Sequence, residues 1–388
     1  MPQRKAIFAS AAGLQKGRDL GTHQLARTFA RNGWDVLLLA APIAVQHLIS
    51  PSLRTSLDRY AVARKGLYEV KFDGGVLRAL TPFAFAAPHP KIPVFNSEWM
   101  LANWFHSSLP SLAGTLARHG FDQADLLLSD TVLFSQVHPH LRNVGKSVFR
   151  VHDNNRAWGR DSEGYKHAES QQAITADLVV HSAETLEEYA NSLGPDVHSR
   201  LLRNGVEYDL FAKSDLARQD GPLTILYMGE MSKRFDSDLI IKYATENPEV
   251  RFVLAGAPNK PIQDSLGSRS NVDLLGEVAY ADLPAILQKC DIGIIPFSKS
   301  APAALINATN PLKLYQYMAS GLPVVALDYP GLPVKEAPCF VYDGYDGFCR
   351  SIDLAAAYGK RESTRLLAKT YDWNHGYRII CEGVGYEV

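Results

Sequence analysis

One segment of the sequence, NATNPLKLYQYMASGLPVV at 307–325, places a cation at the start of an expected helix. We expect Asn310 to cap this helix and Pro311 to lie in its first turn. Lys313 falls in the same turn, where the positive end of the helix dipole disfavours its charge. A lysine there is understandable if an anion occupies the site, and Gln316, one turn later, offers both a donor and an acceptor. The alternative is a lysine that simply points into solvent.

A second candidate is an acidic side chain at the end of an expected strand. In KSVFRVHDNNRAWG, His152 and Asp153 stand where the strand at 146–153 ends. A carboxylate in this position can act as a general base or orient a hydroxyl group. Aspartate also caps helices and forms turns, so a purely structural role for Asp153 is the alternative.

Two further loops, each after an expected strand, could bind anions. The first, AAGLQKGRDLGTHQLA, has three glycines that leave room for a ligand near a helix N-terminus. Their spacing matches neither the dinucleotide-binding nor the phosphate-loop pattern, and a flexible turn explains them equally well. The second, MGEMSKRF, brings small and basic groups to a strand end, which suits a pyrophosphate, although a solvated basic turn is the alternative. Its candidate residues are Ser232, Lys233 and Arg234.

The elements that must position these residues alternate along the chain. KAIFAS, WDVLLLAA, ADLLLSD and ADLVVHS are apolar runs separated by helical patterns, and the alternation restarts near Pro222 with LTILYMGEM and VRFVLAG. Near-continuous apolar strands indicate parallel sheets that are covered on both faces. We therefore predict an α/β fold with two doubly wound, Rossmann-like units. Ligands of such sheets bind beyond the carboxyl ends of the strands, where all four candidate segments fall.

Composition narrows the class of protein. The 388 residues are 46% hydrophobic and 21% charged, which is typical of a globular protein with more than one domain. The four cysteines form no CxxC pair, and no Asp/His cluster has metal-ligand spacing, so we expect a reducing compartment, no metal and no cofactor. The start, MPQRKAIFAS, lacks a signal-peptide core, and no run of 18 apolar residues occurs. These features favour a cytoplasmic location.

Charge is distributed unevenly along the chain. Residues 1–120 hold 14 Lys and Arg against 6 Asp and Glu, whereas the remainder holds 26 against 35. A basic part of this kind can meet an anionic partner, or it can be a solvated surface. The aromatic segment 93–105 lies within it, and Trp99 and Trp104 could contact an anionic membrane; the alternative is that these aromatics are core. No nucleic-acid-binding signature accompanies the charge, so we expect no nucleic-acid partner.

Several segments together resemble the GT-B glycosyltransferases. NPLKLYQYMASGLPVV is similar to their donor-site helix and following strand, RNGVEYDLF at 203–211 to their interdomain turn, and YDWNHGYRI to their terminal helix. The resemblance covers essentially the whole chain and is strongest over 203–330. It implies an acceptor-binding domain at 1–205, a nucleotide-sugar-binding domain at 206–370, and a helix at 371–388 that crosses back to the first domain.

Two subgroups of that family compete. In the large retaining group, two acidic residues eight positions apart frame the donor helix, but Ala308 and Gln316 stand there in this sequence. The inverting glucuronosyltransferases of bacterial xanthan assembly resemble it elsewhere: their base matches Asp153 and their donor-site glutamate matches Glu277. Their phosphate-contacting lysine and a nearby glutamine match Lys313 and Gln316. Their donor-site aromatic matches a phenylalanine that lacks the hydroxyl group. The resemblance implies donor binding by Met231, Ser232, Lys233, Arg234, Glu277, Phe297, Asn310, Leu312, Lys313 and Gln316.

The implied reaction moves a sugar from a nucleotide-diphospho-sugar, expected to be UDP-linked, to an acceptor hydroxyl with inversion. Asp153 would be the general base, and cations would stabilise the leaving diphosphate. The acceptor side would include Gly17, Arg18, His23 and His152. By resemblance the acceptor is a carbohydrate or lipid-linked sugar in polysaccharide or glycolipid assembly, at the inner face of the cytoplasmic membrane. A retaining transferase and a non-catalytic nucleotide-sugar- or carbohydrate-binding protein are the alternatives.

Overall fold

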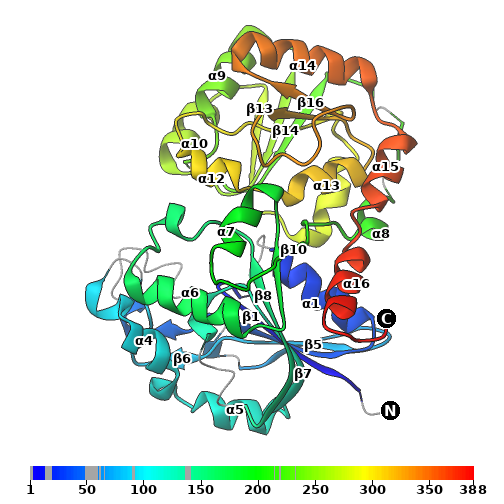
Figure 1. Ribbon diagram of the computed structural model, residues 1–388. Helices are drawn as coiled ribbons and strands as arrows, with labels where there is room; N and C mark the ends of the chain where they lie inside the picture. The colour runs from blue at the N-terminus through cyan, green and yellow to red at the C-terminus, as the bar shows by residue number, and fades with distance from the viewer. Residues whose placement is uncertain are drawn as a thin grey trace. The chain divides into compact units, whose positions relative to one another are not determined.

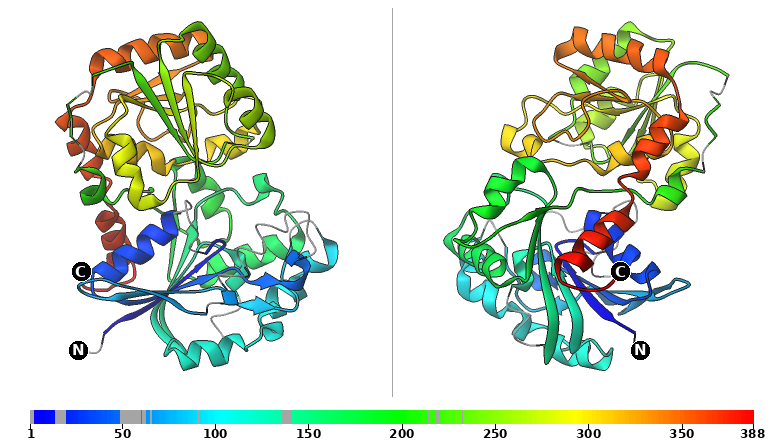
Figure 2. Two further views of the ribbon diagram at one scale, coloured as in Figure 1. Left: turned by 180° about the vertical axis from the view of Figure 1, so that it is seen from behind. Right: turned by 45° about the vertical axis from the view of Figure 1, so that its right-hand side comes forward.

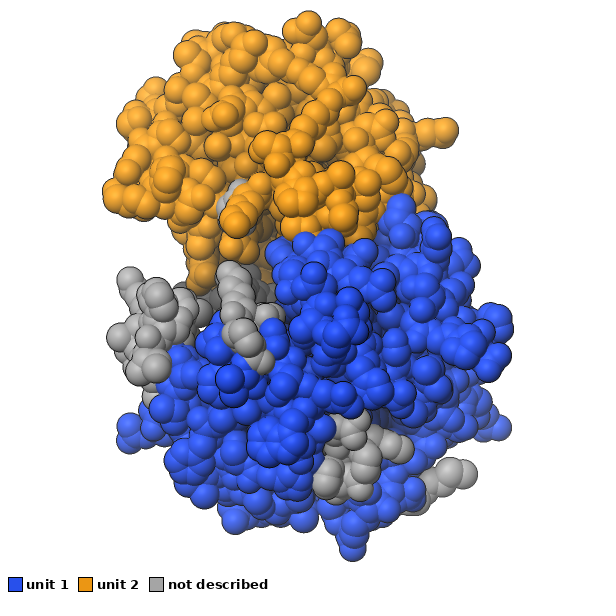
Figure 3. Space-filling model, turned by 60° about the vertical axis from the view of Figure 1, so that its left-hand side comes forward, with its two compact units in different colours: residues 1–14, 22–202, 376–388 blue, residues 15–21, 203–375 orange. Residues whose placement is uncertain are grey.

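The computed structural model describes residues 3–13, 20–48, 60, 63–64, 66–89, 92–135, 141–213, 215–217, 220–231 and 233–388. The chain divides into two compact units, which are coloured separately in Figure 3. Unit 1 comprises residues 1–14, 22–202 and 376–388, and unit 2 comprises residues 15–21 and 203–375. That unit 1 binds an acceptor and unit 2 a donor stays a prediction.

Unit 1 is built on a sheet whose strand order is β10-β9-β8-β7-β1-β2-β5-β4. All neighbouring pairs are parallel except β4 and β5. The strands are β1 (Lys5–Ser10), β2 (Asp35–Ala40), β4 (Tyr68–Lys71), β5 (Val76–Leu80), β7 (Gln123–Ser129), β8 (Asn143–Val151), β9 (Leu178–His181) and β10 (Arg200–Leu201). Two short strands, β3 (Ile43–Ala44) and β6 (Phe83–Ala84), pair separately.

Helices cover both faces of this sheet (Figures 1 and 2). They include α1 (Gly21–Arg31), α4 (Glu98–Asn103), α5 (Leu112–Arg118), α6 (Glu163–Thr175), α7 (Glu187–Asn191) and, from residue 376, the end of α16 (Trp373–Gly383). The C-terminal segment joins unit 1 through aromatic packing. The ring of Phe29 on α1 meets Tyr377 edge to face at 4.7 Å, and Trp34 Nε1 donates a hydrogen bond to the Tyr377 hydroxyl at 3.3 Å.

Unit 2 has a six-stranded parallel sheet of order β13-β12-β11-β14-β15-β16. The strands are β11 (Thr224–Met228), β12 (Arg251–Ala255), β13 (Val272–Gly276), β14 (Ile292–Ile295), β15 (Val324–Leu327) and β16 (Cys339–Tyr342). The helices include α8 (Tyr208–Phe211), α9 (Ser237–Glu246), α10 (Lys260–Leu266), α11 (Leu283–Leu287), α12 (Ala303–Asn307), α13 (Leu312–Ala319), α14 (Gly344–Tyr358) and α15 (Glu362–Lys369).

The order of strands shows where each sheet can bind a ligand. In unit 2 the order reverses between β11 and β14, and in unit 1 it reverses between β1 and β7. Loops on either side of such a point diverge to opposite faces of the sheet and open a crevice at the carboxyl ends of the strands. The residues that follow β11 and β14, and those that follow β1 and β7, are therefore placed to line binding sites.

The structure corrects the prediction that Trp104 contacts a membrane. Trp104 is 1% exposed, its indole Nε1 donates a 2.6 Å hydrogen bond to the Leu133 carbonyl, and its ring meets Phe134 edge to face. It belongs to the core of unit 1 because its polar atom has an internal partner and its ring a close-packed one. Trp99, on α4, is 69% exposed. In the described part of the chain, no helix is both long enough and apolar enough to cross a bilayer.

The predicted cap of the donor-like helix is also wrong. Helix α13 starts at Leu312, so Pro311 occupies the N-cap position and no side chain caps the helix. Asn310 lies one residue earlier and is buried, and its carbonyl accepts a 2.6 Å hydrogen bond from Asn204 Nδ2. Proline supplies no capping oxygen, so the first amide groups of α13 receive no bond from an N-cap side chain.

Candidate functional site

A cavity of about 310 Å³ opens in unit 2 at the carboxyl ends of β11 and β14. We call it the cation pocket; its lining includes Tyr227, Gly229, Arg234, Thr309, Lys313 and Gln316. A larger cavity of about 1010 Å³ lies at the opposite ends of these strands, around Thr224, Arg251 and Asp291. Because parallel sheets bind ligands at the carboxyl ends of their strands, the smaller cavity is the candidate site.

Close packing of α13 on the sheet brings Lys313 into this pocket. Gly293 in β14 leaves room for the Tyr317 ring, since a Cβ atom at residue 293 would lie 2.3 Å from Tyr317 Cγ. The Tyr317 hydroxyl then accepts a 2.9 Å hydrogen bond from the Met228 amide at the end of β11. Lys313 is one turn before Tyr317, so it is carried to the same strand ends.

The ammonium group of Lys313 is enclosed by a ring and a close backbone. Its Nζ lies 4.1 Å from the centroid of the Tyr227 ring, within the range of a cation–π contact. Gly229, with φ +130°, passes so near that a Cβ atom there would lie 2.8 Å from Nζ. Only glycine readily combines this backbone conformation with that clearance.

Two cations, Lys313 and Arg234, line the pocket. Burial, and secondarily the charge of Arg234, lower the pKa of Lys313 from its ordinary 10.5 to about 7. Arg234 Nη1 donates a 3.2 Å hydrogen bond to Thr309 Oγ1, and its guanidinium lies 5.9 Å from the Phe297 ring. Among the residues that the structure describes, Lys313 has neither an ion-pair nor a hydrogen-bond partner.

The N-terminus of α13 adds to this field. Its uncapped amide groups carry a positive partial charge and lie beside the lysine and the arginine. Glu230 and Glu277, both exposed, also line the cavity, but neither forms an ion pair with a described residue. Two cations and a helix end that converge on one cavity favour an anionic ligand with several oxygens, such as a diphosphate.

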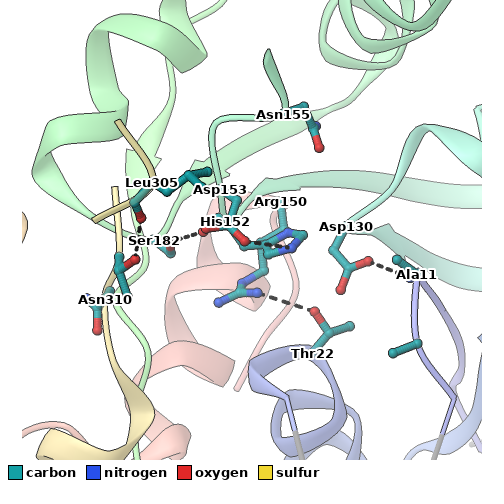
Figure 4. A network of polar contacts seen from close by, with 12 residues as sticks. Ala11, Thr22, Asp130, Arg150, His152, Asp153, Asn155, Ser182, Leu305 and Asn310 are labelled. Carbon is teal, nitrogen blue, oxygen red and sulfur yellow. Dashed lines mark hydrogen bonds and ion pairs between the residues drawn. The ribbon is translucent and has the colours of Figure 1, made fainter. Parts of the chain in front are cut away.

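Unit 1 has a polar network at the corresponding end of its sheet, which Figure 4 shows at close range. Asp130, after β7, accepts hydrogen bonds from Ser10 Oγ at 2.9 Å and from the Ala11 amide at 3.1 Å. Arg150, 2% exposed, donates to Thr22 Oγ1 at 3.3 Å. Burial lowers the pKa of the Arg150 guanidinium, and the charges of Asp130 and Asp153 oppose that effect.

His152 and Asp153 lie next to this network. His152 Nε2 is 3.7 Å from Asp153 Oδ2, and the two side chains are 30% and 28% exposed, so both can reach a ligand. The His152 carbonyl accepts a 3.0 Å hydrogen bond from Ser182 Oγ. His23 is buried, and its Nε2 lies 2.9 Å from the Ala12 carbonyl. Unit 1 thus presents an acid and an imidazole at the carboxyl end of β8.

The other predicted site residues fall into three groups. Gly17, Arg18 and Ser232 lie outside the described residues. Glu277, Phe297, Leu312 and Gln316 line the cation pocket together with Arg234 and Lys313. Three do not line it: Lys233 is exposed, Asn310 is buried, and Met231 is fully buried in the core with its amide bonded to the Ala257 carbonyl.

Sequence reasoning missed several residues that line the pocket, among them Tyr227, Gly229, Glu230 and Thr309. In the sequence, Tyr227 is indistinguishable from the apolar strand residues around it in LTILYMGEM, and Thr309 from an ordinary loop residue. Gly229 carried a usable signal, because a glycine directly after a strand often marks a close backbone approach. Grouped His, Cys, Asp and Glu side chains that could hold a metal ion are not found in the described ranges.

Comparisons with known proteins place these sites in context. Residues 222–357, which lie in unit 2, match the family model described as Glycosyl transferases group 1. The sucrose-phosphate synthase from Thermosynechococcus elongatus superimposes with a TM-score of 0.67 at 16% identity, covering 98% of each chain. Anabaena HepE in complex with UDP and glucose gives 0.64 at 15% identity, covering 99% of this chain and 100% of that one. The chain has the GT-B fold.

Two curated relatives are similar to part of this GT-B chain. The putative teichuronic acid biosynthesis glycosyltransferase TuaH of Bacillus subtilis is 29% identical over 206 residues, which are 48% of this chain and 50% of the relative. The D-inositol 3-phosphate glycosyltransferase of Mycobacterium tuberculosis (strain F11) is 25% identical over 199 residues, 46% of this chain and 38% of the relative. The chain thus spans half the length of these relatives or less. The predicted fold class is confirmed.

The lowered pKa of Lys313 predicts a pH-dependent stability. Its pKa of about 7 in the folded chain lies below the ordinary 10.5, so the unfolded chain binds more protons between these values. Stability should therefore rise with pH across this window. Lys313→Met should be more stable than the parent chain at about pH 6.5, and its advantage should shrink as the pH approaches about 9.5. Chemical denaturation at three pH values measures the difference; a constant difference would mean that Lys313 is solvated.

Proposed function

We propose that this chain is a glycosyltransferase that moves a sugar from a nucleotide-diphospho-sugar, UDP-linked, to an acceptor hydroxyl in polysaccharide assembly. One observation carries the proposal: Lys313 and Arg234 converge at the uncapped N-terminus of α13, in the unit that matches the group 1 glycosyl transferases. The UDP in the Anabaena structure and the polymer in the name of the Bacillus relative support this donor and this pathway.

The cation pocket suits the leaving group of this reaction. As the bond between the anomeric carbon and the diphosphate breaks, negative charge grows on the phosphate oxygens. Lys313, Arg234 and the amides of α13 are fixed before the reaction, so they stabilise that charge without reorganising. Gln316 and Glu277 line the same cavity and can hydrogen-bond the ribose or the sugar hydroxyls.

We further propose that the anomeric configuration is retained. The sequence alone favoured inversion with Asp153 as base, but group 1 glycosyl transferases typically retain configuration, so the match at 222–357 supports the other outcome. In such a reaction an oxygen of the leaving phosphate accepts the acceptor's proton on the face from which it departs. The cation pocket serves that step directly, and Asp153 then orients the acceptor hydroxyl instead of deprotonating it.

The rival proposal is a non-catalytic protein of the same fold that binds nucleotide sugars or carbohydrates. The cation pocket alone does not separate binding from transfer, because both need affinity for a diphosphate. The half-exposed pair of His152 and Asp153 favours transfer, since it offers polar groups for an acceptor hydroxyl. Release of UDP by the parent chain in the presence of an acceptor, and its loss in a pocket variant, would decide for the enzyme.

The first test concerns donor binding. Lys313→Ala should weaken UDP binding by about 1.5–3 kcal/mol, the range for a charge-assisted contact in a partly enclosed site. Lys233→Ala is the matched control, because Lys233 is exposed and does not line the cavity; its affinity should stay within about 0.5 kcal/mol of the parent chain. Isothermal titration calorimetry measures both. If both substitutions weakened UDP binding equally, the cation pocket would not be the donor site.

The second test concerns stereochemistry. With an α-linked UDP-sugar donor, proton NMR of the first product should show an α linkage. Asp153→Asn should keep measurable turnover, because the amide can still orient a hydroxyl, whereas loss of a general base lowers rates by about two to four orders of magnitude. A β-linked product, together with a loss of that size, would restore inversion with Asp153 as base.

We propose that the acceptor is a carbohydrate or lipid-linked sugar that the chain meets as a cytoplasmic, peripheral protein on an anionic membrane. Trp104 is excluded from such a surface by its burial, but Trp99 is 69% exposed and Val94 72% exposed. Both belong to the segment 1–120, which has an excess of basic residues. Exposed apolar side chains in a segment with an excess of basic residues suit the interface of anionic lipids.

Sedimentation with vesicles tests this membrane proposal. The chain should bind vesicles that contain anionic lipid, binding should weaken as salt rises, and Trp99→Ser should reduce it by about threefold or more. Leu354→Ser in unit 2 is the control, since Leu354 is 57% exposed on an element outside the basic segment. Binding that is absent at low salt, or is equally affected by the control, would leave only a soluble acceptor.

A further inference from the structure

The loop that follows β8 presents an aromatic ring between two arginines. Residues 153–160 contain a short 3₁₀ turn, Arg156–Trp158, which ends at Gly159 with φ +73°. Trp158 is 44% exposed, Arg156 is exposed, and Arg160 is half-buried. An exposed tryptophan flanked by guanidinium groups is a common way to bind a charged sugar, because the ring covers the C–H face and the cations meet the charge.

A buried acid anchors this loop to two helices. Glu169, on α6, is only 2% exposed. One carboxylate oxygen accepts a 2.7 Å hydrogen bond from Asn155 Nδ2, and the other accepts a 2.6 Å bond from the Tyr189 hydroxyl on α7. Figure 4 places Asn155 on the loop next to His152 and Asp153. These contacts hold the loop in one conformation in which Arg156 and Trp158 are exposed.

The two guanidinium groups are positioned by neutral partners. Arg160 Nη1 donates a 3.1 Å hydrogen bond to Asn155 Oδ1, and the guanidinium of Arg156 lies 5.4 Å from the centroid of the Tyr189 ring. Within the described ranges, neither arginine forms an ion pair. Three nearby acids are accounted for: Asp153 faces His152, Glu163 pairs with Lys166, and both oxygens of Glu169 are occupied.

We infer that Arg156, Trp158 and Arg160 bind an anionic group, carboxylate or phosphate, on the acceptor sugar. Guanidinium groups that are fixed but lack an acidic partner match the two oxygens of such a group. The same loop starts with His152 and Asp153 at the carboxyl end of β8, where the acceptor hydroxyl would lie. This inference names the acceptor class of the proposed transferase and rests on that proposed function.

The test uses three trisaccharides of similar size: trigalacturonate, maltotriose carrying one phosphate, and neutral maltotriose. Each is titrated calorimetrically into the full chain in the presence of saturating UDP, which fills the cation pocket. At least one anionic probe should bind, and more tightly than maltotriose. The charge-removing variant, Arg156→Gln with Arg160→Gln, should weaken that binding by about tenfold, and Trp158→Ala by a similar factor. Which anionic probe binds more tightly separates carboxylate from phosphate.

Arg142→Gln is the matched control, because Arg142 is an exposed arginine of the same unit that pairs with Asp122; it should bind like the parent chain. The double variant with Lys in place of Gln should keep part of the affinity, which guards against a folding defect. UDP affinity should be unchanged in all loop variants, because the cation pocket lies in unit 2. Equal binding of maltotriose and the anionic probes, or equal loss in the control, would overturn the inference, whereas absent UDP binding alone would overturn the donor assignment.

Discussion

The contact between Gly293 and Tyr317 is the constraint on which the cation pocket depends. A side chain at 293 would occupy the space of the Tyr317 ring, so glycine is what lets α13 settle on β14. The hydroxyl group of Tyr317 then holds the end of β11 through the Met228 amide. Lys313 and Gln316 are on the helical turn before Tyr317. The position of the Tyr317 ring in the core therefore determines where the ammonium group of Lys313 and the amide of Gln316 enter the cavity. The packing of the core thus sets the positions of the side chains that line the pocket.

The same packing gives Lys313 an electrostatically unfavourable place in the chain alone. A lysine against an aromatic ring, beside an arginine and at the positive end of a helix, has lost water without gaining an acidic partner among the described residues. A folded protein retains such an unfavourable arrangement when another interaction offsets its cost, and the binding of an anion is the simplest such interaction. Stability of the unliganded chain and affinity for an anion therefore oppose each other at one residue.

The fold could be predicted from the sequence because the strands are short apolar runs that alternate with helical patterns, and this order is compatible with few topologies. KAIFAS and WDVLLLAA became β1 and β2, and the second series became β11 to β15. Lys313 could be singled out because its charge conflicts with its place in a helix. Trp104 could not be placed, since an aromatic next to other aromatics reads the same whether it is core or surface. The structure places Trp104 in the core because its indole nitrogen donates a hydrogen bond to the Leu133 carbonyl. That partner is 29 residues away in the sequence.

The cap of α13 shows a different limit of sequence reasoning. Asparagine is a better capping residue than proline, so the pattern Asn-Pro-Leu-Lys favours a start at Asn310. In the structure the carbonyl of Asn310 is engaged by Asn204 and the helix begins two residues later. Pro311 takes the N-cap position instead, one residue later than the pattern favours. The consequence is chemical, because an asparagine cap would have occupied an amide group that is instead available to a ligand.

The two units treat buried charge differently. In unit 1 a buried acid, Glu169, has both oxygens satisfied by neutral donors, and it fixes a loop on which Arg156 is exposed and Arg160 half-buried. In unit 2 the positions where the large retaining group carries two acids hold Ala308, which is 5% exposed, and Gln316. A carboxylate at either position would partly neutralise Lys313 and Arg234. Alanine and glutamine add no negative charge beside Lys313 and Arg234, which suits the anionic ligand that we propose for this pocket.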